Sequence, residues 1–300
     1  VCGLNLLSVL MLIAEIGGSS SRWAWLPEEG PELSIPVHVD TMPGFNPLSG
    51  NSGIFASGIT TYFNAHAPLA LSASKISVYA AGCGSEQRRS VMDGTISSIW
   101  PAASVEVNTD LLGAARGLHG SESGLVLILG TGMNVGWYDG ERLHQPMPSL
   151  GYMLGDEGSG ADIGRVLLQD AFYQRMPDPM RTALFGHDGP LVERIIDEVY
   201  RSPFPAKALA ARTALLAGVV QEPYARELIL SRFHALVEIL KSFFPPEQRG
   251  NVKATGSVAW GFRELLANCL LDHGMELTAV ERDPLQGLVR WHRQQALRAH

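Results

Sequence analysis

The sequence predicts an α/β protein with two domains, and three observations support this class. The chain has 300 residues, enough for two domains of ordinary size that each bury a core. Hydrophobic residues make up 46% and charged residues 18%, a balance typical of folded globular proteins. In both halves, strand pairs are followed by strand–helix units, which favours mixed sheets covered by helices. The halves share this order of elements, so a duplicated unit is one interpretation.

The most informative stretch is residues 125–168. It begins with the apolar run 125–129, which is long enough for a buried strand and too short for a helix. The turn 130–132, Gly-Thr-Gly, carries almost no side chains, so its backbone can approach an anionic ligand. Residues 134–138 then form a second strand. A dinucleotide site needs glycines between a strand and a helix. The stretch instead predicts a hairpin whose turn can hold a phosphate.

The chain is predicted to open with a strand over residues 8–14. The apolar run 4–16 has no basic residue before it, contains Glu15 and is too short to span a bilayer, so we expect a buried strand and no signal peptide. Residues 17–21 bring two glycines and three hydroxyls. They can face a phosphate, with Glu15 toward a hydrated Mg²⁺. They also suit an ordinary hairpin turn, and the sequence leaves both interpretations open.

The remaining elements follow from hydrophobic periodicity and from proline and glycine positions. Further strands are predicted over residues 33–39, 75–80, 104–107, 251–255 and 275–280. Helices are predicted over residues 52–65, 86–100, 111–118, 161–175, 190–200, 206–220, 223–244, 256–272 and from 284 onward.

Polar residues and a glycine lie where predicted strands end. Asn46 precedes a proline and is held extended, so its amide either completes a turn or reaches a ligand hydroxyl. Asp110 stands between a strand and a helix, where it suits a helix N-cap as well as a catalytic base. Gly256 lies at a strand-to-helix turn, which can place a ligand against the helix N-terminus.

Charge and cysteine usage limit the classes of partner. The net charge of −7 argues against a nucleic-acid or anionic-membrane partner. Three widely spaced cysteines suit a reducing compartment and exclude a disulfide framework, so the cytoplasm is expected. The nine histidines show no paired spacing with histidine or cysteine, so a structural zinc site is not expected.

Taken together, these stretches resemble the BadF/BadG/BcrA/BcrD-type ATPase and N-acetylglucosamine kinase family, within the actin/sugar-kinase/Hsp70 superfamily. The resemblance follows one order along nearly the whole chain, and its Gly-Asp-Glu-Gly-Ser-Gly block is the most distinctive part. The matching segments are 15–21 (first phosphate loop), 44–47 (Gly-x-Asn-Pro sugar loop), 108–117 (catalytic aspartate), 130–132 (second phosphate loop), 154–164 (glycine-rich block) and 255–259 (adenosine motif).

The resemblance implies two ribonuclease H-like (actin-like ATPase) domains with an interdomain cleft. The N-terminal domain would span 1–118, with the helix 284–300 packing back on it, and the C-terminal domain would span 119–283. ATP would bind in the cleft with Mg²⁺, and an amino sugar would lie deeper. The implied activity is phosphorylation of an N-acetylated amino sugar. The first candidate substrate is N-acetylglucosamine, phosphorylated at its 6-hydroxyl, and the alternative is N-acetylmuramic acid of cell-wall recycling.

The family's functional residues carry over onto matching positions. Asp110 would accept the proton of the attacking hydroxyl, and Glu15 would contact Mg²⁺ through water. The sugar would be held by Asn46, Gly132, Asn134 and Asp156, although Asp156 also suits a helix cap. The nucleotide would be held by Gly17, Gly18, Ser19, Gly130, Thr131, Gly132, Gly256 and Ser257.

Three positions depart from the family pattern. Glu15 replaces an aspartate, and its extra methylene still allows it to reach a metal-bound water. Ser20 stands where the family has a lysine, which removes a positive charge near the phosphates. Met133 replaces a hydroxyl residue after the second phosphate loop. These changes bear on catalytic rate more than on fold.

Two further functions stay open at the level of sequence. An activator ATPase of the same family would need cysteines that hold an iron–sulfur cluster across a dimer, and only Cys83 has a suggestive glycine setting. A non-catalytic regulator that binds sugar and ATP would fit the altered first loop. No helix-turn-helix segment precedes the first strand, so such a regulator would act through a protein partner. A homodimer is a candidate state because dimers are common in the family.

Overall fold

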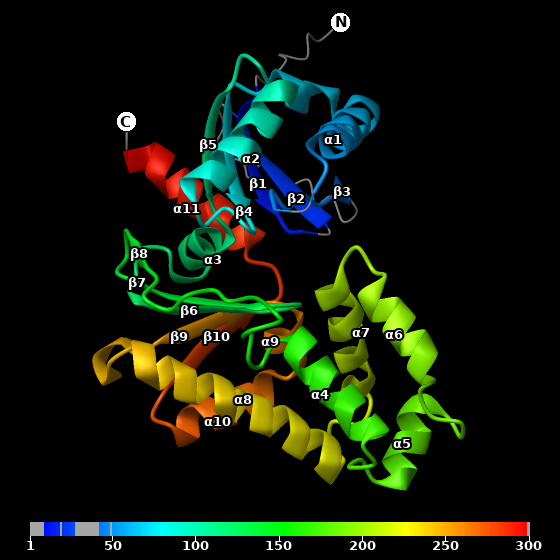
Figure 1. Ribbon diagram of the computed structural model, residues 1–300. Coiled ribbons are helices and arrows are strands. Elements are labelled where there is room, and N and C mark those ends of the chain that lie inside the picture. The colour runs from blue at the N-terminus through cyan, green and yellow to red at the C-terminus, as the bar shows by residue number, and fades with distance from the viewer. Residues whose placement is uncertain (1–8, 19, 28–41, 49, 299–300) are drawn as a thin grey trace, which may run out of the picture. The chain divides into compact units, whose positions relative to one another are not determined.

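The computed structural model describes residues 9–18, 20–27, 42–48 and 50–298, and the chain divides into two compact units (Figure 1). The first unit comprises Val1–Gly120 and Pro284–His300, and the second comprises Ser121–Asp283. The C-terminal helix therefore belongs to the same unit as the N-terminal part of the chain. The sequence analysis drew its boundaries after residues 118 and 283.

The described residues of the first unit form a five-stranded sheet of order β3-β2-β1-β4-β5. Strands β1, β4 and β5 run parallel, whereas β2 is antiparallel to β1 and to β3. The strand bounds are β1 Val9–Ile16, β2 Ser20–Pro27, β3 Met42–Pro43, β4 Lys75–Ala80 and β5 Ser104–Thr109.

Helices cover both faces of this sheet. Alternate residues of β1 point to opposite faces, and both sets are apolar, so each face is buried by helices. Leu12 and Ala14 join a core with helices α1 and α2, and Met11 and Ile13 join another with α11. Figure 1 shows α11, in red, beside α3. The helix bounds are α1 Ser52–His66, η1 Pro68–Ser72, α2 Glu86–Ile99, α3 Asp110–His119 and α11 Leu285–Arg298.

A buried polar chain also holds α11 on the sheet. Arg116 of α3 donates from Nη1 to the Tyr79 hydroxyl at 2.8 Å, and that hydroxyl lies 2.9 Å from Nε2 of His292. Burial lowers the pKa of His292 to about 3, and the charge of Arg116 adds to this shift. The imidazole is therefore neutral at physiological pH, where it can accept a hydrogen bond.

The described residues of the second unit form a sheet of order β10-β9-β6-β7-β8, in which β6, β9 and β10 run parallel and β7 is antiparallel to β6 and β8. The strand bounds are β6 Gly124–Leu129, β7 Met133–Tyr138, β8 Leu143–His144, β9 Val252–Thr255 and β10 Leu277–Glu281. The helices are α4 Gly160–Phe172, α5 Asp178–Phe185, α6 Val192–Tyr200, α7 Pro205–Ala217, α8 Pro223–Phe243, η2 Pro246–Gln248, α9 Ser257–Gly261 and α10 Arg263–Asp272.

The two sheets share one topology. Each begins with a hairpin, adds a short antiparallel edge strand, and continues on the other side of its first strand with two parallel strands. The turn between β1 and β2 in the first unit therefore corresponds to the turn between β6 and β7 in the second. The duplicated order of elements in the sequence reflects this repeated topology, and the α/β class of two mixed sheets with helices is confirmed.

Several predicted elements differ from the structure. Residues 20–27 form β2, a strand that was not predicted; Ser21 donates its hydroxyl to the Pro43 carbonyl at 2.8 Å. The helix predicted over 256–272 is broken at Phe262, whose φ of −117° and ψ of 28° are not helical. Helix α5 was not predicted. The strand predicted over 33–39 lies outside the described residues.

Candidate functional site

In the first unit, the carboxyl ends of three parallel strands meet at one edge of the sheet. Ile16 of β1 lies opposite Ala80 of β4, and Ala80 lies opposite Thr109 of β5. The next residues, Gly17 and Asp110, therefore leave the sheet at the same edge. Ligands of open α/β sheets bind outside the carboxyl ends of the strands. This edge is the candidate site of the first unit.

Asp110 is the first residue of α3, and the N-cap is its neighbour Thr109. The Thr109 hydroxyl accepts the Leu112 N–H at 3.2 Å, and Oδ1 of Asp110 accepts the Leu111 N–H at 2.8 Å. The cap interpretation of Asp110 is therefore wrong, because the preceding residue performs that role. The half-buried Asp110 carboxylate sits at the positive end of the helix dipole.

Asn46 packs against two glycines from different segments of this edge. A Cβ on Gly18 would lie 3.9 Å from Asn46 Cβ, and a Cβ on Gly82 would lie 2.6 Å from Asn46 Oδ1. Only glycine at residue 82, whose φ is +79°, admits that approach. Oδ1 accepts the Leu48 N–H at 2.9 Å in a turn. Asn46 is thus both a turn residue and a neighbour of the first glycine loop.

The first glycine loop is a tight hairpin turn between β1 and β2. The Gly17 N–H donates to the Ser20 carbonyl at 2.9 Å, and the Gly17 carbonyl accepts the Phe45 N–H at 3.0 Å. The second bond joins the loop to the segment that carries Asn46. The hairpin interpretation of these residues is confirmed for the described part. Ser19 lies outside the described residues.

Glu15 lies inside β1 and forms an ion pair with Arg22 on β2. Arg22 Nη2 is 2.8 Å from Glu15 Oε2, and the Glu15 side chain is 14% exposed. The two residues face each other across the hairpin register. The guanidinium brings a positive charge next to the glycine loop. The sequence analysis did not identify Arg22, although its position opposite Glu15 follows from the hairpin.

In the second unit, the turn 130–132 meets the start of α4 and the residue that follows β9. The Gly130 carbonyl accepts the Gly160 N–H at 2.8 Å, and the Thr131 carbonyl accepts the Ala161 N–H at 3.0 Å. A Cβ on Gly256, whose φ is +108°, would lie 2.3 Å from the Leu129 carbonyl oxygen. These close approaches place Gly256 directly beside the turn. Ser257, the next residue, is exposed.

Asp156 is a buried carboxylate in contact with the other end of the same turn. Its Oδ2 would be 2.7 Å from a Cβ on Gly132, and the side chain is hydrogen-bonded by the Met133 backbone. Burial raises the pKa of Asp156 to about 6, the Met133 bond opposes this shift, and the charges of Glu157 and Asp162 add to it. The predicted cap role is wrong, because the N-cap of α4 is Ser159.

Asn134 follows the turn on β7 and is held by its side-chain oxygen. Oδ1 accepts the Gln145 Nε2–H at 2.6 Å and the Val135 N–H at 3.1 Å. Gln145 was not predicted as a site residue, since nothing in its sequence neighbourhood indicates its proximity to Asn134. The structure thus brings the turn, Asp156, Asn134 and Gly256 together on the second unit.

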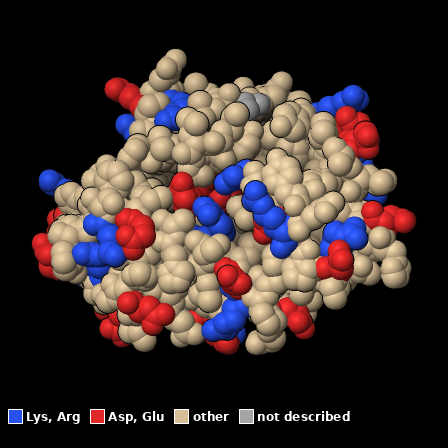
Figure 2. Space-filling view, turned by 60° about the horizontal axis from the view of Figure 1, so that its bottom comes forward, with Lys and Arg blue, Asp and Glu red and all other residues tan. Residues whose placement is uncertain are grey.

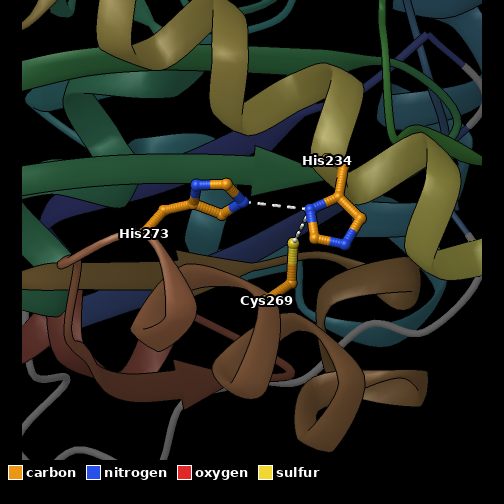
Figure 3. A group of neighbouring side chains, drawn as sticks. All are labelled: His234, Cys269 and His273. Carbon is orange, nitrogen blue, oxygen red and sulfur yellow. Dashed lines mark hydrogen bonds between the residues drawn. The ribbon is translucent and has the colours of Figure 1, made fainter.

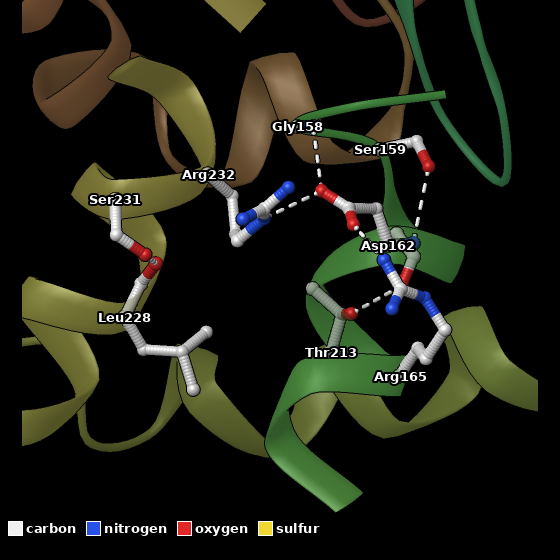
Figure 4. A network of polar contacts seen from close by, with 9 residues as sticks. Gly158, Ser159, Asp162, Arg165, Thr213, Leu228, Ser231 and Arg232 are labelled. Carbon is white, nitrogen blue, oxygen red and sulfur yellow. Dashed lines mark hydrogen bonds and ion pairs between the residues drawn. The ribbon is translucent and has the colours of Figure 1, made fainter. Parts of the chain in front are cut away.

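The glycine-rich block also builds a polar network that sequence reasoning missed (Figure 4). Asp162, 2% exposed, accepts the Gly158 N–H at 2.9 Å and the Arg232 Nε–H at 2.8 Å through Oδ2. Its Oδ1 accepts from Arg165 at 2.7 Å. Thr213 of α7 donates to the Gly160 carbonyl at 2.7 Å. The network holds the block and the start of α4 against α7 and α8, and therefore supports Asp156 indirectly.

A separate hollow of about 500 Å³ lies on the second unit. None of the predicted site residues lines it. Gln145, which donates to Asn134, is one of its lining residues. Its lining residues are Trp137, His144, Gln145, Pro146, Phe243, Pro245 and Gln248. In Figure 2, Lys and Arg side chains are interspersed with Asp and Glu over the face in view, and no large patch of one sign appears there. No helix among the described residues is long and apolar enough to cross a bilayer.

The chain has the two-domain actin-like fold of sugar kinases. No family model matches it. Among solved structures, a candidate N-acetylglucosamine kinase from Porphyromonas gingivalis is 27% identical, with a TM-score of 0.82 over 95% of this chain and 99% of that one. A candidate N-acetylglucosamine kinase from Chromobacterium violaceum is 18% identical, with a TM-score of 0.66 over 94% and 98% of the chains, and it supports the fold alone.

One curated relative is also similar in sequence. The N-acetylmuramic acid/N-acetylglucosamine kinase of Clostridium acetobutylicum is 28% identical over 56% of this chain. The match covers 59% of that relative, so the chain spans about three fifths of its length.

Proposed function

We propose that this protein is an ATP-dependent kinase that phosphorylates an N-acetylated amino sugar, with N-acetylglucosamine as the leading substrate and its 6-hydroxyl as the acceptor. The observation that carries the proposal is the position of Asp110 at the carboxyl edge of β1, β4 and β5, the edge that also bears the Gly17 turn. The similarity to candidate N-acetylglucosamine kinases over nearly the whole chain supports it. Membership of the BadF-type family is part of this proposal.

Asp110 acts as the general base. Its carboxylate accepts the proton of the sugar hydroxyl as that oxygen attacks the terminal phosphorus of ATP, and ADP leaves. One carboxylate oxygen is held by the Leu111 N–H at 2.8 Å, which orients the group. Catalysis of phosphoryl transfer depends mostly on positioning and on charge neutralisation, so an oriented base is sufficient.

The two glycine turns bind phosphate. Residues 17–18 and 130–132 occupy equivalent places in the two sheets, and a Cβ on Gly130 would meet nothing within 4 Å. The space beside the Gly130 Cα is therefore free for a phosphate, and the exposed Thr131 adds a hydroxyl. We include Ser19 in the first turn. Gly256 and Ser257 follow β9 beside the second turn and would contact the adenosine.

Glu15 and Arg22 are the two charged side chains proposed to act beside the first turn, Glu15 toward Mg²⁺ and Arg22 toward phosphate. When bound, Mg²⁺ neutralises phosphate oxygens and lowers the barrier to transfer. Glu15 would contact it through water, and its ion pair with Arg22 holds the carboxylate in place. Arg22 supplies the positive charge that Ser20 does not.

The sugar is bound by Asn46, Gly132, Asn134 and Asp156. The amide of Asn46 donates to a hydroxyl, while its oxygen remains in the turn with Leu48. Gln145 orients Asn134. Once ionised, the Asp156 carboxylate accepts hydrogen bonds from sugar hydroxyls. Its pKa of about 6 allows this ionisation at neutral pH. Buried polar groups of this kind reject sugars that lack the matching hydroxyl.

The test is ADP release by purified protein with Mg-ATP and a panel of sugars: N-acetylglucosamine, N-acetylmuramic acid, glucosamine and glucose. We expect one amino sugar to be turned over, and Asp110→Asn to lower kcat by about 100- to 10,000-fold with the fold retained. Asp93→Asn, on α2 of the same unit, is the matched control and should keep its activity. Protein that binds ATP but releases no sugar-dependent ADP would refute the kinase proposal.

N-acetylmuramic acid is the second candidate substrate, favoured by the name of the Clostridium acetobutylicum relative. The same panel decides between the two sugars, because only N-acetylmuramic acid carries a lactyl group on O3. Sugar binding without turnover would instead indicate a regulator. The activator ATPase is disfavoured, since Cys83 is 1% exposed and burial raises the pKa of its thiol to about 11.

The proposal extends to partners and location. The ligands are small molecules, and we assign no nucleic-acid or membrane partner, in keeping with the net charge of −7. A cytoplasmic location and a homodimer complete the proposal. Size-exclusion chromatography with light scattering tests the dimer, which a monomer at micromolar concentration would contradict.

A further inference from the structure

Three side chains with metal-binding atoms converge on the second unit (Figure 3). His234 projects from α8, and Cys269 and His273 come from the end of α10. Nδ1 of His234 lies 3.0 Å from Nε2 of His273 and 3.5 Å from Sγ of Cys269. All three ligand atoms lie within 4.8 Å of one another.

Hydrogen bonding alone accounts poorly for this convergence. Both short contacts end on the same atom, Nδ1 of His234. A neutral ring nitrogen offers either one lone pair or one proton, so it makes one good hydrogen bond and not two. A cation at the centre would accept a lone pair from each of the three atoms at once.

The spacing of the atoms suits a tetrahedral ion. With Zn–N near 2.0–2.1 Å and Zn–S near 2.3 Å, ligand atoms of a tetrahedral site lie about 3.3–3.7 Å apart. The separations of 3.0 and 3.5 Å lie near those values, and the third, between Cys269 and His273, is within 4.8 Å, so side-chain rotation closes the triangle. Two imidazoles and a thiolate favour zinc over magnesium or calcium, which prefer oxygen ligands.

The surrounding structure supports such a site. Cys269 and His273 are four residues apart at the end of α10, so they lie on one side of it. Cys269 is 1% exposed and belongs to the core of the unit, whereas His234 is exposed to solvent. His273 turns Nε2 toward His234, and its Nδ1 lies 3.9 Å from Oε1 of Glu238, a contact longer than a hydrogen bond. The negative charge of Glu238 next to the ring favours a cation at the site.

We propose that His234, Cys269 and His273 bind a zinc ion that joins α8 to α10, with a water molecule as the fourth ligand. On binding, the S–H bond of Cys269 breaks, the zinc–sulfur bond forms, and the proton passes to solvent. The site is structural: it links two helices that pack beside the sheet of the second unit. It is independent of the proposed kinase activity. The sequence analysis did not expect it: the Cys269–His273 pair, four residues apart, was overlooked, and His234 comes from a helix far away in the sequence.

The test uses Co²⁺ as a spectroscopic substitute for zinc, on full-length protein stripped with a chelator and freed of any purification tag. We expect one equivalent of Co²⁺ to produce the visible bands of a tetrahedral site and a thiolate-to-cobalt charge-transfer band, and zinc to displace both. Histidines elsewhere can bind Co²⁺, but they cannot produce the charge-transfer band. A wild-type protein without that band overturns the proposal.

Variants identify the ligands. Cys269→Ser should abolish the charge-transfer band, and the matched control Cys83→Ser, at another buried thiol, should retain it. His234→Ala should weaken Co²⁺ binding at least about tenfold, since it removes a direct ligand. His234 is exposed, so this variant folds even if Cys269→Ser does not. Zinc should raise the melting temperature of the wild type and leave that of His234→Ala unchanged. Unchanged Co²⁺ affinity in His234→Ala contradicts the assignment.

Discussion

At the scale of single residues, Asp156 combines three unfavourable features that a purely structural residue would avoid. Its carboxylate is buried, its φ of 64° lies in the left-handed region, and it presses against Gly132. Strained, desolvated residues of this kind gather at functional sites. The geometry therefore agrees with the proposed role of Asp156 in sugar binding, and the cost it imposes on folding can be measured.

Asp156→Asn should stabilise the protein at neutral pH. Burial raises the pKa of Asp156 from 3.8 to about 6, so its cost to folding free energy builds up as pH rises from about 4 to 6 and stays constant above that. The difference amounts to about 2–3 kcal/mol at pH 7 and vanishes below pH 4. Denaturant unfolding of wild type and variant between pH 4 and pH 8 measures it, and kinetics at pH 7 should show weaker sugar binding by the variant.

Asp139→Asn is the control with the opposite sign. Hydrogen bonds from the Arg142 backbone and from His144 hold the pKa of Asp139 below its usual range. Its contribution to stability is therefore present above pH 4 and is lost as pH falls below that value. A stability gain in Asp156→Asn that does not change with pH would exclude buried ionisation as its cause.

Gly132→Ala should disturb the same carboxylate from the side of the turn. Its Cβ would lie 2.7 Å from Asp156 Oδ2, so the carboxylate must shift and its bond from the Met133 backbone must weaken. We expect a loss of about 1–2 kcal/mol in the free energy of unfolding. Gly130→Ala, two residues away and with open space around its Cβ, should change stability by less than about 0.5 kcal/mol. Equal losses in both variants would contradict the contact argument.

At the scale of elements, Asp162 joins the glycine-rich block to helix α8. Arg232→Ala removes the α8 partner of Asp162. The Asp162 carboxylate, 2% exposed, then keeps one guanidinium partner, that of Arg165, in place of two. We expect a loss of about 2–4 kcal/mol in unfolding free energy, measured by denaturant titration. Arg165→Ala is the matched control: that side chain is 43% exposed, and its loss should cost less than about 1 kcal/mol. A smaller effect for Arg232→Ala than for Arg165→Ala would refute this ranking.

At the scale of the whole molecule, the chain completes the first unit only with its last helix. Gly287 of α11 lies so close to α3 that a Cβ would be 2.0 Å from the Gly117 carbonyl oxygen. Gly287→Ala should therefore displace α11 and destabilise the first unit by about 2–3 kcal/mol or more. Scanning calorimetry should detect this as a lower melting temperature for the transition of the first unit.

The control for this prediction is Gly94→Ala on α2 of the same unit. A Cβ there meets nothing within 4 Å, and alanine is favoured over glycine inside a helix by about 0.5–1 kcal/mol. The variant should therefore be at least as stable as the wild type. Equal destabilisation by both substitutions would show that the docking of α11 is not the cause.

Local sequence patterns were enough to predict the fold class, the order of most elements and the places of the glycine turns. The apolar run of β6, the turn 130–132 and the strand-to-helix step at Asp110 depend on residues close together in the chain, so periodicity and glycine content reveal them. Predictions failed where tertiary contacts override local preference. The single helix predicted over 256–272 is interrupted at Phe262, whose side chain packs in the core of the second unit.

Only the tertiary structure decided which side chains share a site. The pairing of Asp162 with Arg232 joins residues 70 positions apart, and the contact of Asn46 with Gly82 depends on where a loop folds over the sheet edge. The convergence of His234 with Cys269 depends on how α8 packs beside α10. Local patterns specify helices and strands because their hydrogen bonds are short in sequence. Contacts between distant side chains follow from the register and packing of those elements, which no local pattern encodes.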